Sequence, residues 1–167
     1  MRCQHDGGIY PPSEDTYLML EALKELSGDV CIDVGAGSCV LARRLAERCR
    51  HVIAVDVDIE ACKSCLHDVD VVCGDGAAAF RRGDVLVSNL PYLPPEEPHY
   101  VDLYDVGLTQ KVLRWISAFR PRVFVLTSSS LGRIDLILEA TRAICRVARV
   151  VKLHLFFEDI YVVVALC

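Results

Sequence analysis

The sequence has no apolar run long enough to cross a membrane, although its mean hydropathy is positive at +0.33. A membrane helix needs about 18 consecutive apolar residues. The longest candidate, residues 147–157, is interrupted by Arg149, Lys152 and His154. The first residues also lack the apolar core of a signal peptide. We therefore expect a cytoplasmic protein with no membrane partner, whose apolar residues fill a covered sheet and a patch covered by another protein.

An excess of positive charge is missing as well, because the formal net charge is -5. Proteins that grip a phosphate backbone usually carry the opposite balance. We therefore do not expect nucleic acid as the direct substrate, unless a basic partner holds it.

The nine cysteines lack the regular spacing of a secreted disulfide framework. We expect reduced, buried thiols that pack as small hydrophobic side chains. Cys62 and Cys65 have the spacing of a metal or redox pair, but no second such pair follows. We expect a structural role for both and no metal site. A hyperthermophilic source would leave room for a disulfide.

Short apolar segments alternate along the chain with longer segments of helical periodicity. The expected strands are residues 30–34, 51–55, 69–73, 85–87 and 123–126. The expected helices are one that begins at Ser13 and ends at Gly28, and then residues 41–49, 59–66, 108–119 and 131–145. This alternation predicts an α/β protein with a doubly wound, mostly parallel sheet and right-handed crossovers.

The end of the sequence departs from that alternation. Residues 147–157 and 160–166 read as two long strands, joined by a tight turn at Glu158-Asp159. We therefore predict a seven-stranded sheet that ends in an antiparallel hairpin. No internal repeat, linker or low-complexity segment is present, so we expect one domain over residues 1–167.

A glycine loop follows the first expected strand, in the order Asp33-Val34-Gly35-Ala36-Gly37. Gly35 and Gly37 permit a tight turn and a close approach of the backbone to a ligand. The dinucleotide fingerprint would need another glycine three residues after Gly37, where Val40 stands. Asp33 would repel a pyrophosphate but attract an ammonium group, such as the one in the amino acid part of S-adenosylmethionine.

Two more carboxylates follow neighbouring strands. Asp56 closes the second expected strand, about 20 residues after the first glycine, where an acidic residue accepts hydrogen bonds from ribose hydroxyls. Asp75 closes the third and is placed to accept from an adenine amino group. Ligands of such sheets bind beyond the carboxyl ends of the strands. The three carboxylates therefore predict a cofactor site at this edge.

The fourth expected strand ends in Asn89-Leu90-Pro91-Tyr92. Pro91 restricts Leu90 to extended geometry and fixes the direction of its carbonyl. The Asn89 side-chain oxygen offers a second acceptor, and two convergent acceptors suit an NH₂ group. Tyr92 supplies an aromatic wall for a flat group. We therefore expect methyl transfer to a planar nitrogen held by this loop, with no strong base required.

Residues 10–16, Tyr-Pro-Pro-Ser-Glu-Asp-Thr, resemble the opening motif of the archaeal and eukaryotic HemK-type glutamine methyltransferases, Tyr-x-Pro-x-Glu-Asp-Thr. The glycine loop, the two later carboxylates, the Asn89 loop and the closing hairpin follow in that family's order. The resemblance implies a Rossmann-like methyltransferase fold with S-adenosylmethionine as cofactor. The implied cofactor contacts are Thr16, Asp33, Gly35, Gly37, Asp56, Asp75 and Asn89. The implied catalytic residues are Asn89, Pro91 and Tyr92, with Leu90 completing the substrate-binding loop.

The resemblance also implies the partners of the protein. The substrate would be the glutamine of the Gly-Gly-Gln loop of a translation release factor, methylated on its side-chain amide nitrogen. A small zinc-binding activator protein would form a heterodimer with the chain and cover apolar surface near the third strand. The N-terminal helical domain of the bacterial relatives is not expected here.

The sequence departs from the family pattern in three places. The third glycine of the loop is replaced by Cys39. The family's Asn-Pro-Pro-Tyr is here Asn-Leu-Pro-Tyr, and the loss of one proline would cost roughly 0.4–1 kcal/mol of preorganisation. The segment after Tyr92 is short, with residues 94–98 and 105–107 in place of a glycine-rich stretch, which affects the shape of the substrate mouth.

Two other interpretations remain open. The Asn-Leu-Pro-Tyr motif resembles that of the ribosomal RNA adenine dimethyltransferases. Their target is a flat base with an exocyclic NH₂ group, taken out of its stack. Those enzymes add a basic C-terminal helical domain, which this sequence is not expected to contain. A non-enzymatic binding subunit is the other alternative, and the intact Asn89 and aspartates argue against it.

Overall fold

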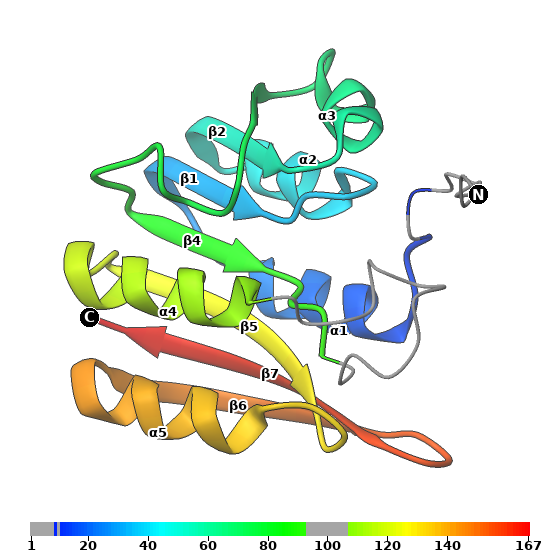
Figure 1. The fold of residues 1–167 in the computed structure, drawn as a ribbon, viewed down its shortest axis with the longest axis vertical. Helices are drawn as coiled ribbons and strands as arrows, with labels where there is room; N and C mark the ends of the chain where they lie inside the picture. Colours follow the sequence, from blue (N-terminus) through cyan, green and yellow to red (C-terminus); the bar gives the residue numbers. More distant parts are fainter. Residues whose placement is uncertain (1–8, 10, 93–106) are drawn as a thin grey trace, which may run out of the picture.

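The computed structural model describes residue 9, residues 11–92 and residues 107–167. Within these residues, seven strands form one sheet in the order β3-β2-β1-β4-β5-β7-β6 (Figure 1). They are β1 (Gly28–Val34), β2 (Cys49–Asp56), β3 (Asp70–Cys73), β4 (Val85–Ser88), β5 (Val123–Ser129), β6 (Arg146–His154) and β7 (Asp159–Leu166). The first five are parallel, and β7 runs antiparallel to both β5 and β6. The predicted fold class is confirmed.

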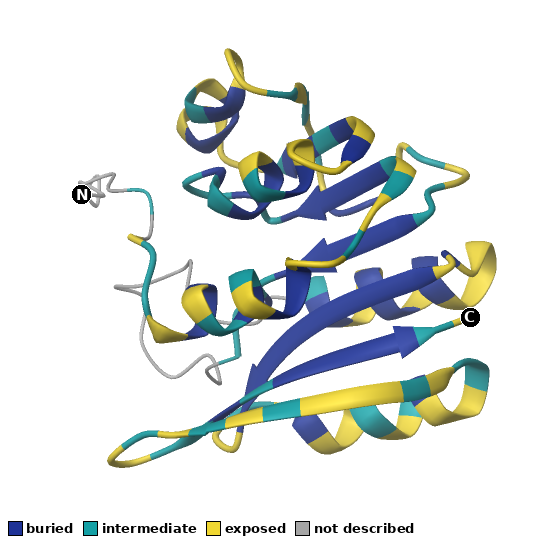
Figure 2. Ribbon diagram, turned by 180° about the vertical axis from the view of Figure 1, so that it is seen from behind, coloured by how far each residue is buried: buried dark blue, intermediate teal, exposed yellow. Residues whose placement is uncertain are grey.

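Helices cover both faces of the sheet, so that two hydrophobic cores form (Figures 1 and 2). One face carries α1 (Glu14–Leu23), α2 (Val40–Ala46) and α3 (Ile59–Cys65); the other carries α4 (Leu108–Phe119) and α5 (Ile134–Ile144). The central strands β4 and β5 are buried along their whole length, as expected for strands covered on both sides. Among the described helices, none combines the length and the apolar composition required to traverse a bilayer.

Four predicted element boundaries were wrong by several residues, each because a local turn or strand intervenes. The first helix ends at Leu23 rather than Gly28, which begins β1. The second ends at Ala46, because Cys49 already belongs to β2 and pairs with Gly28. The last helix begins at Ile134, after a turn that the sequence pattern had assigned to it. Strand β6 stops at His154, because the Leu155 N–H donates to the Glu158 carbonyl at 2.8 Å and closes the hairpin early.

The expectation of reduced thiols was wrong for eight of the nine cysteines. Disulfides join Cys31 to Cys49, Cys39 to Cys65, Cys62 to Cys73 and Cys145 to Cys167. The partners are 11 to 26 residues apart in sequence, and the fold brings their Cα atoms to between 4.6 and 6.2 Å. Strand pairing, parallel for β1–β2 and antiparallel for β6–β7, and helix packing create this proximity, so the spacing in the sequence does not reveal it. Cys62 and Cys65, which look like a pair, bond to different partners.

The bond between Cys145 and Cys167 gives a test of this covalent network. A Cys145→Ser/Cys167→Ser variant should lose about 3 kcal/mol of unfolding free energy, because a bridge across a loop of this size restricts the unfolded chain. Cys167 is exposed and Cys145 is half-buried, so little packing is lost with the sulfurs. Denaturant titration without reductant measures the loss. Equal unfolding midpoints for the wild type with and without dithiothreitol would contradict the assignment.

Candidate functional site

A cavity of about 230 Å³ lies at the carboxyl ends of the parallel strands. Its wall contains every predicted site residue except Asp33: Thr16, Gly35, Gly37, Asp56, Asp75, Asn89, Leu90, Pro91 and Tyr92. These residues come from α1 and from the ends of β1, β2, β3 and β4, which parallel pairing places along one edge. The chain therefore gathers the predicted residues in one place. Tyr10 of the opening motif and residues 94–98, 105 and 106 of the predicted mouth lie outside the described residues.

The glycine loop lines part of the cavity. Gly35 and Gly37 have φ values of +74° and +49°, in the left-handed region that favours glycine. The loop is held to β2, because the N–H groups of Gly35 and Ala36 both donate to the Val55 carbonyl at 2.8 and 3.1 Å. A Cβ added to Gly37 would meet nothing within 4 Å, so conformation rather than space requires glycine there.

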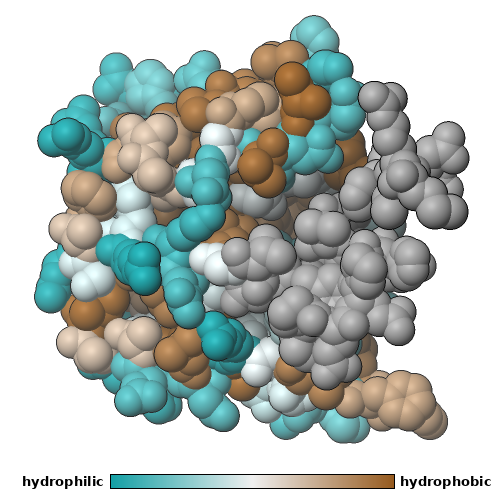
Figure 3. Space-filling view, in the orientation of Figure 1, coloured by the Kyte–Doolittle hydropathy of each residue, from teal (hydrophilic) through white to brown (hydrophobic). Residues whose placement is uncertain are grey.

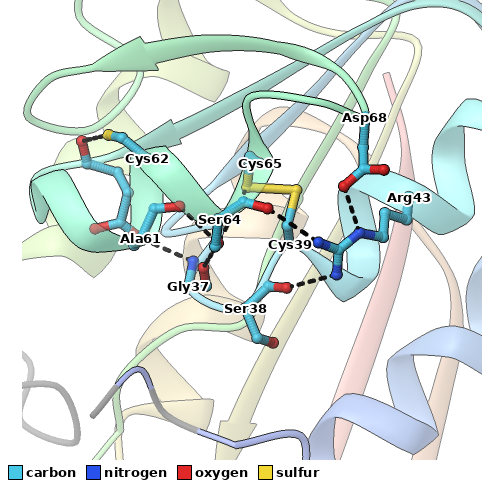
Figure 4. Close-up of a disulfide and its surroundings, with 10 residues drawn as sticks. Gly37, Ser38, Cys39, Arg43, Ala61, Cys62, Ser64, Cys65 and Asp68 are labelled. Carbon is cyan, nitrogen blue, oxygen red and sulfur yellow. Dashed lines mark hydrogen bonds and ion pairs between the residues drawn. A yellow bond between two sulfur atoms is a disulfide. The ribbon is translucent and has the colours of Figure 1, made fainter.

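Cys39, which stands where the resembled motif has its third glycine, also has a left-handed backbone, with φ at +66°. This conformation costs a residue with a side chain about 1 kcal/mol or more, which explains a glycine at this position elsewhere. Here the Cys39 N–H donates to the Ala36 carbonyl at 2.8 Å, and the side chain is bonded to Cys65 of α3 (Figure 4). The disulfide bond therefore compensates for the backbone strain of a residue other than glycine at this position.

The same loop is braced against α3 by polar side chains (Figure 4). The Ser64 hydroxyl lies 3.0 Å from the Gly37 carbonyl. The Arg43 guanidinium donates to the carbonyls of Ser38 and Ser64 at 2.9 and 3.0 Å, and it pairs with Asp68 at 2.8 Å. Several independent contacts thus hold the glycine turn in one position relative to α3.

Asp56 shapes the cavity as well as lining it. Its Oδ2 accepts from the Gly37 N–H and its Oδ1 from the Asp58 N–H, both at 2.9 Å. Each carboxylate oxygen has a further lone pair for a ligand hydroxyl. The predicted role of Asp56 as a ribose acceptor remains a prediction, and its hold on the glycine loop is a function that the sequence did not reveal.

Asp75 forms an ion pair with Lys111 of α4, which also lines the cavity. The pair is half exposed, so it contributes little to stability. Sequence reasoning missed Lys111, because α4 follows a long segment and no pattern ties it to the third strand. The expected contact of Asp75 with an adenine amino group stays a prediction.

A directed chain of hydrogen bonds orients the Asn89 side chain. The Thr16 hydroxyl donates to the acceptor-only carboxylate of Asp15 at 3.2 Å, so it accepts from Asn89 Nδ2 at 3.4 Å. On the other side, the Thr127 hydroxyl accepts from the Leu90 N–H at 3.2 Å and donates to Asn89 Oδ1 at 2.5 Å, a shorter contact than those to the Ser88 carbonyl and Met19 Sδ at 3.4 and 3.5 Å. The Asp15 end specifies the orientation of Asn89, the short contact with Thr127 agrees with it, and one lone pair of Asn89 Oδ1 remains for another partner.

Leu90 stands where the resembled motif Asn-Pro-Pro-Tyr has its first proline. Its side chain is buried in the α4–α5 core, and its N–H makes the hydrogen bond to Thr127 that a proline at this position has no N–H to make. A hydrogen bond to a buried strand thus replaces ring rigidity. Thr127 lies on β5 and was not predicted, since nothing in a buried β5 sequence marks it as a loop partner.

The turn between β5 and α5 lies directly against the loop of residues 89–92. A Cβ built on Gly132 would come within 2.6 Å of the Tyr92 carbonyl oxygen and 2.7 Å of the Tyr92 Cβ. Only glycine permits this approach. The position of Tyr92 is therefore coupled to the start of α5.

Asp33 is the one predicted residue that the cavity wall does not include. It is fully buried on the α1–α2 side of the sheet, two residues after Cys31 on the same face of β1. Neither carboxylate oxygen has a hydrogen-bond partner among the residues that the structure describes. Burial raises the pKa of Asp33 to about 7, the nearby Ala42 backbone N–H lowers this pKa, and the charge of Asp56 raises it. Its expected contact with a ligand ammonium group remains a prediction.

Asp15 is a carboxylate on the wall to which sequence reasoning gave no role. It is 3% exposed, and its Oδ1 accepts from the Thr16 N–H at 2.6 Å and from the Ser13 hydroxyl at 2.9 Å. The signal that would have found it is its place beside Thr16 in the opening motif. A buried carboxylate on a cavity wall favours a cationic ligand group.

This sheet order, with the antiparallel β7 inserted before β6 and a cavity at the carboxyl ends, is the class I S-adenosylmethionine-dependent methyltransferase fold. No protein-family model matches the chain. The chain is similar to Methyltransferase HEMK2 of Mus musculus, with 35% identity over 112 residues that cover 53% of this chain and 52% of that one. It therefore spans about half the length of this relative.

Two further proteins bear on the site. The chain is 42% identical over 72 residues to the "Probable ribosomal RNA small subunit methyltransferase A" of Methanosarcina acetivorans, covering 38% of this chain and 26% of that one. Among solved structures, the Mtq2–Trm112 complex of E. cuniculi, described as methylating the translation termination factor eRF1, matches with a TM-score of 0.74. That match has 24% identity and covers 94% of this chain and 97% of the other.

Thr127→Val tests the hydrogen-bond chain without reference to any activity. Valine keeps the shape of the side chain but leaves the buried Leu90 N–H without an acceptor, which should cost about 1–3 kcal/mol. The Leu90 amide should also exchange its hydrogen faster in NMR experiments. Thr127→Ser keeps the hydroxyl and should restore protection of this amide. Unchanged exchange in the valine variant would show that the loop is held by other contacts.

Asp33 predicts how stability depends on pH. Folding raises the pKa of Asp33 from 3.8 to about 7, so between these pH values the folded state holds a proton that the unfolded state releases. The contribution of Asp33 to the free energy of unfolding is therefore full below about pH 4 and is lost as the pH rises to about 7. Asp33→Asn has no such dependence and should be more stable than the wild type at pH 8, by on the order of 4 kcal/mol, with the difference vanishing near pH 4. Thermal unfolding across this range measures it.

Asp70→Asn is the matched control, because Asp70 is exposed at the start of β3. It should leave the pH profile of stability unchanged. If Asp33→Asn and the wild type show parallel profiles from pH 4 to 8, Asp33 is not the protonated group.

Proposed function

We propose that this chain transfers a methyl group from S-adenosylmethionine to the side-chain amide nitrogen of a glutamine, that of the Gly-Gly-Gln motif in a translation release factor. The observation that carries the proposal is the oriented Asn89 oxygen on the cavity wall, beside the Leu90-Pro91-Tyr92 backbone. The likeness to HEMK2 and to the Mtq2 structure supports it. We take residues 1–167 as one catalytic domain that works in the cytoplasm, where release factors act.

The carboxylates and the glycine backbone on the cavity wall suit the chemical groups of S-adenosylmethionine. That cofactor supplies an electrophilic methyl group on a sulfonium. The backbone of Gly35 and Gly37 would lie close to it, and Asp56 would accept from its ribose hydroxyls. Asp15 would attract its positively charged amino acid part, a task for which its place on the wall suits it better than that of Asp33. Asp75 would accept from its adenine amino group.

The chain's contribution to the reaction is orientation and electrostatics. An amide nitrogen is a weak nucleophile, because its lone pair is delocalised into the carbonyl. Asn89 Oδ1 and the Leu90 carbonyl would accept its two N–H groups, which turns the nitrogen toward the methyl group. These acceptors also place negative partial charge where positive charge develops on nitrogen. Tyr92 would cover the flat face of the amide, and the proton would leave to solvent after transfer.

We further propose that a small zinc-binding activator covers the β3 edge of the sheet. β3 is a four-residue edge strand, and large apolar side chains are exposed near it: Val57 at 77%, Ile59 at 61% and Leu66 at 58%. The Mtq2 structure is itself a complex with the second protein Trm112. An uncovered edge strand with apolar neighbours favours association with another chain.

The second candidate substrate is an adenine amino group in RNA or DNA. The observation in its favour is the similarity to the ribosomal RNA methyltransferase, together with the Asn-Leu-Pro-Tyr motif. An exocyclic NH₂ would meet the same two acceptors. The net charge of -5 argues against a large nucleic acid.

Asn89→Ala separates chemistry from cofactor binding. With one of the two acceptors gone, kcat should fall by about 100-fold, whereas the Kd for S-adenosylmethionine measured by calorimetry should change less than about threefold. Asp56→Ala provides the contrast, because it should weaken cofactor binding first. Equal losses of kcat and cofactor affinity in Asn89→Ala would reject the assigned role.

The substrate is identified with tritiated S-adenosylmethionine, added with the purified chain to an extract of its source. Label should appear in a protein of release-factor size and should vanish when the Gly-Gly-Gln glutamine is replaced. Label that resists protease but disappears with ribonuclease would instead assign the site to a nucleic acid base.

A further inference from the structure

The tip of the β6–β7 hairpin carries two of the most exposed apolar side chains among the described residues. Phe156 is 91% exposed and Phe157 is 86% exposed, and their rings meet edge to face with centroids 4.9 Å apart. Figure 3 shows a hydrophobic projection where Figure 1 places this hairpin. A contiguous pair of exposed aromatic rings marks a contact site more often than an isolated apolar residue does.

The hairpin projects from the same edge of the sheet as the cavity (Figure 1). A chain of contacts joins the two. The Ser130 N–H donates to the Asp159 carbonyl at 2.8 Å, and the Asp159 N–H donates to the Ser130 hydroxyl at 3.0 Å. Two residues later, Gly132 lies against the Tyr92 backbone. The base of the hairpin and the loop of residues 89–92 are thus fixed to the same turn.

The hairpin holds its tip in place through its own contacts. The Leu155 N–H donates to the Glu158 carbonyl at 2.8 Å and closes the turn around the two phenylalanines. Below the turn, the two Asp159 oxygens pair with His154 Nδ1 at 2.6 Å and Lys152 Nζ at 2.7 Å. The rings are therefore presented outward on a braced support.

The charges around the tip indicate which kind of partner fits. Lys152 contributes one positive charge, already paired, and Asp159 and Glu158 contribute two negative charges. Single-stranded nucleic acid binds aromatic platforms that lie in a basic groove, and no such groove surrounds these rings within the described residues. An apolar surface on a folded protein fits the tip better.

We propose that Phe156 and Phe157 form a docking element that packs against an apolar surface of the folded protein substrate, while the target glutamine enters the cavity beside Tyr92. This inference rests on the proposed function and adds a second binding site for the same substrate. It assigns recognition to the fold of the substrate as well as to the methylated loop. A short peptide that carries the loop alone would not reach the tip.

The test compares the wild type with the Phe156→Ala/Phe157→Ala variant on two substrates, the intact release factor and a short peptide. Each enzyme is purified together with any partner protein that binds it. For the intact release factor, KM should rise at least tenfold with kcat unchanged. For a short Gly-Gly-Gln peptide, kcat/KM should not change. The melting temperature should stay that of the wild type, because both side chains are exposed. Phe119→Ala, at the C-terminal end of α4 and 41% exposed, is the matched control and should leave the KM for the intact protein unchanged.

An unchanged KM for the intact protein in the double variant would overturn the docking role while the proposed function stands. An equal rise in KM for protein and peptide would also overturn it, because the effect would then lie in the cavity. Conversion of a dimer to a monomer in light scattering, with KM unchanged, would assign the tip to a second copy of the chain. A wild type that labels no release factor would refute the proposed function itself.

Discussion

The site depends on one directed chain of hydrogen bonds, which runs from the Leu90 N–H through Thr127, Asn89 and Thr16 to the carboxylate of Asp15. A carboxylate only accepts, so the Thr16 hydroxyl donates to Asp15 and the Asn89 nitrogen must face Thr16, which turns the Asn89 oxygen toward Thr127. Hydrogen bonds in such a chain polarise one another and strengthen together. The chain also joins α1, β4 and β5, so the packing of three elements sets the direction of one amide oxygen.

Much of the fold could be predicted, because its signals are local. Buried parallel strands appear as short apolar runs, and a residue that follows such a run arrives at the carboxyl edge of the sheet. This logic brought Asp56, Asp75 and Asn89 to one cavity. Thr127 and Asp15 were missed for the opposite reason. The role of Thr127 comes from its contact with Leu90, 37 residues away, which exists only once β5 is packed. The contact of Asp15 with Thr16 is local, but its place on the cavity wall depends on the packing of α1.

Asp33 and the cysteines show where residue type alone is a poor guide. A carboxylate beside a glycine loop predicts a ligand contact, and that contact stays a prediction, but the sequence did not reveal that the alternation of β1 buries Asp33 on the α1–α2 side of the sheet. The cysteines suggest inert packing, but the fold joins eight of them. Two of these bonds fix α3 to the glycine loop and to β3. Disulfides persist in oxidising compartments and, as an exception, in intracellular proteins of hyperthermophiles.

The hydrogen bond between Leu90 and Thr127 has a consequence for how this loop can diverge. With proline at position 90, the hydroxyl of Thr127 loses its donor, and its remaining partners are Asn89, Ser88 and Met19. With leucine, the hydroxyl also satisfies a buried N–H. The effect of a substitution at residue 127 therefore depends on the residue at position 90, which is epistasis between β5 and the loop. Lineages with either residue at position 90 would tolerate different replacements on β5.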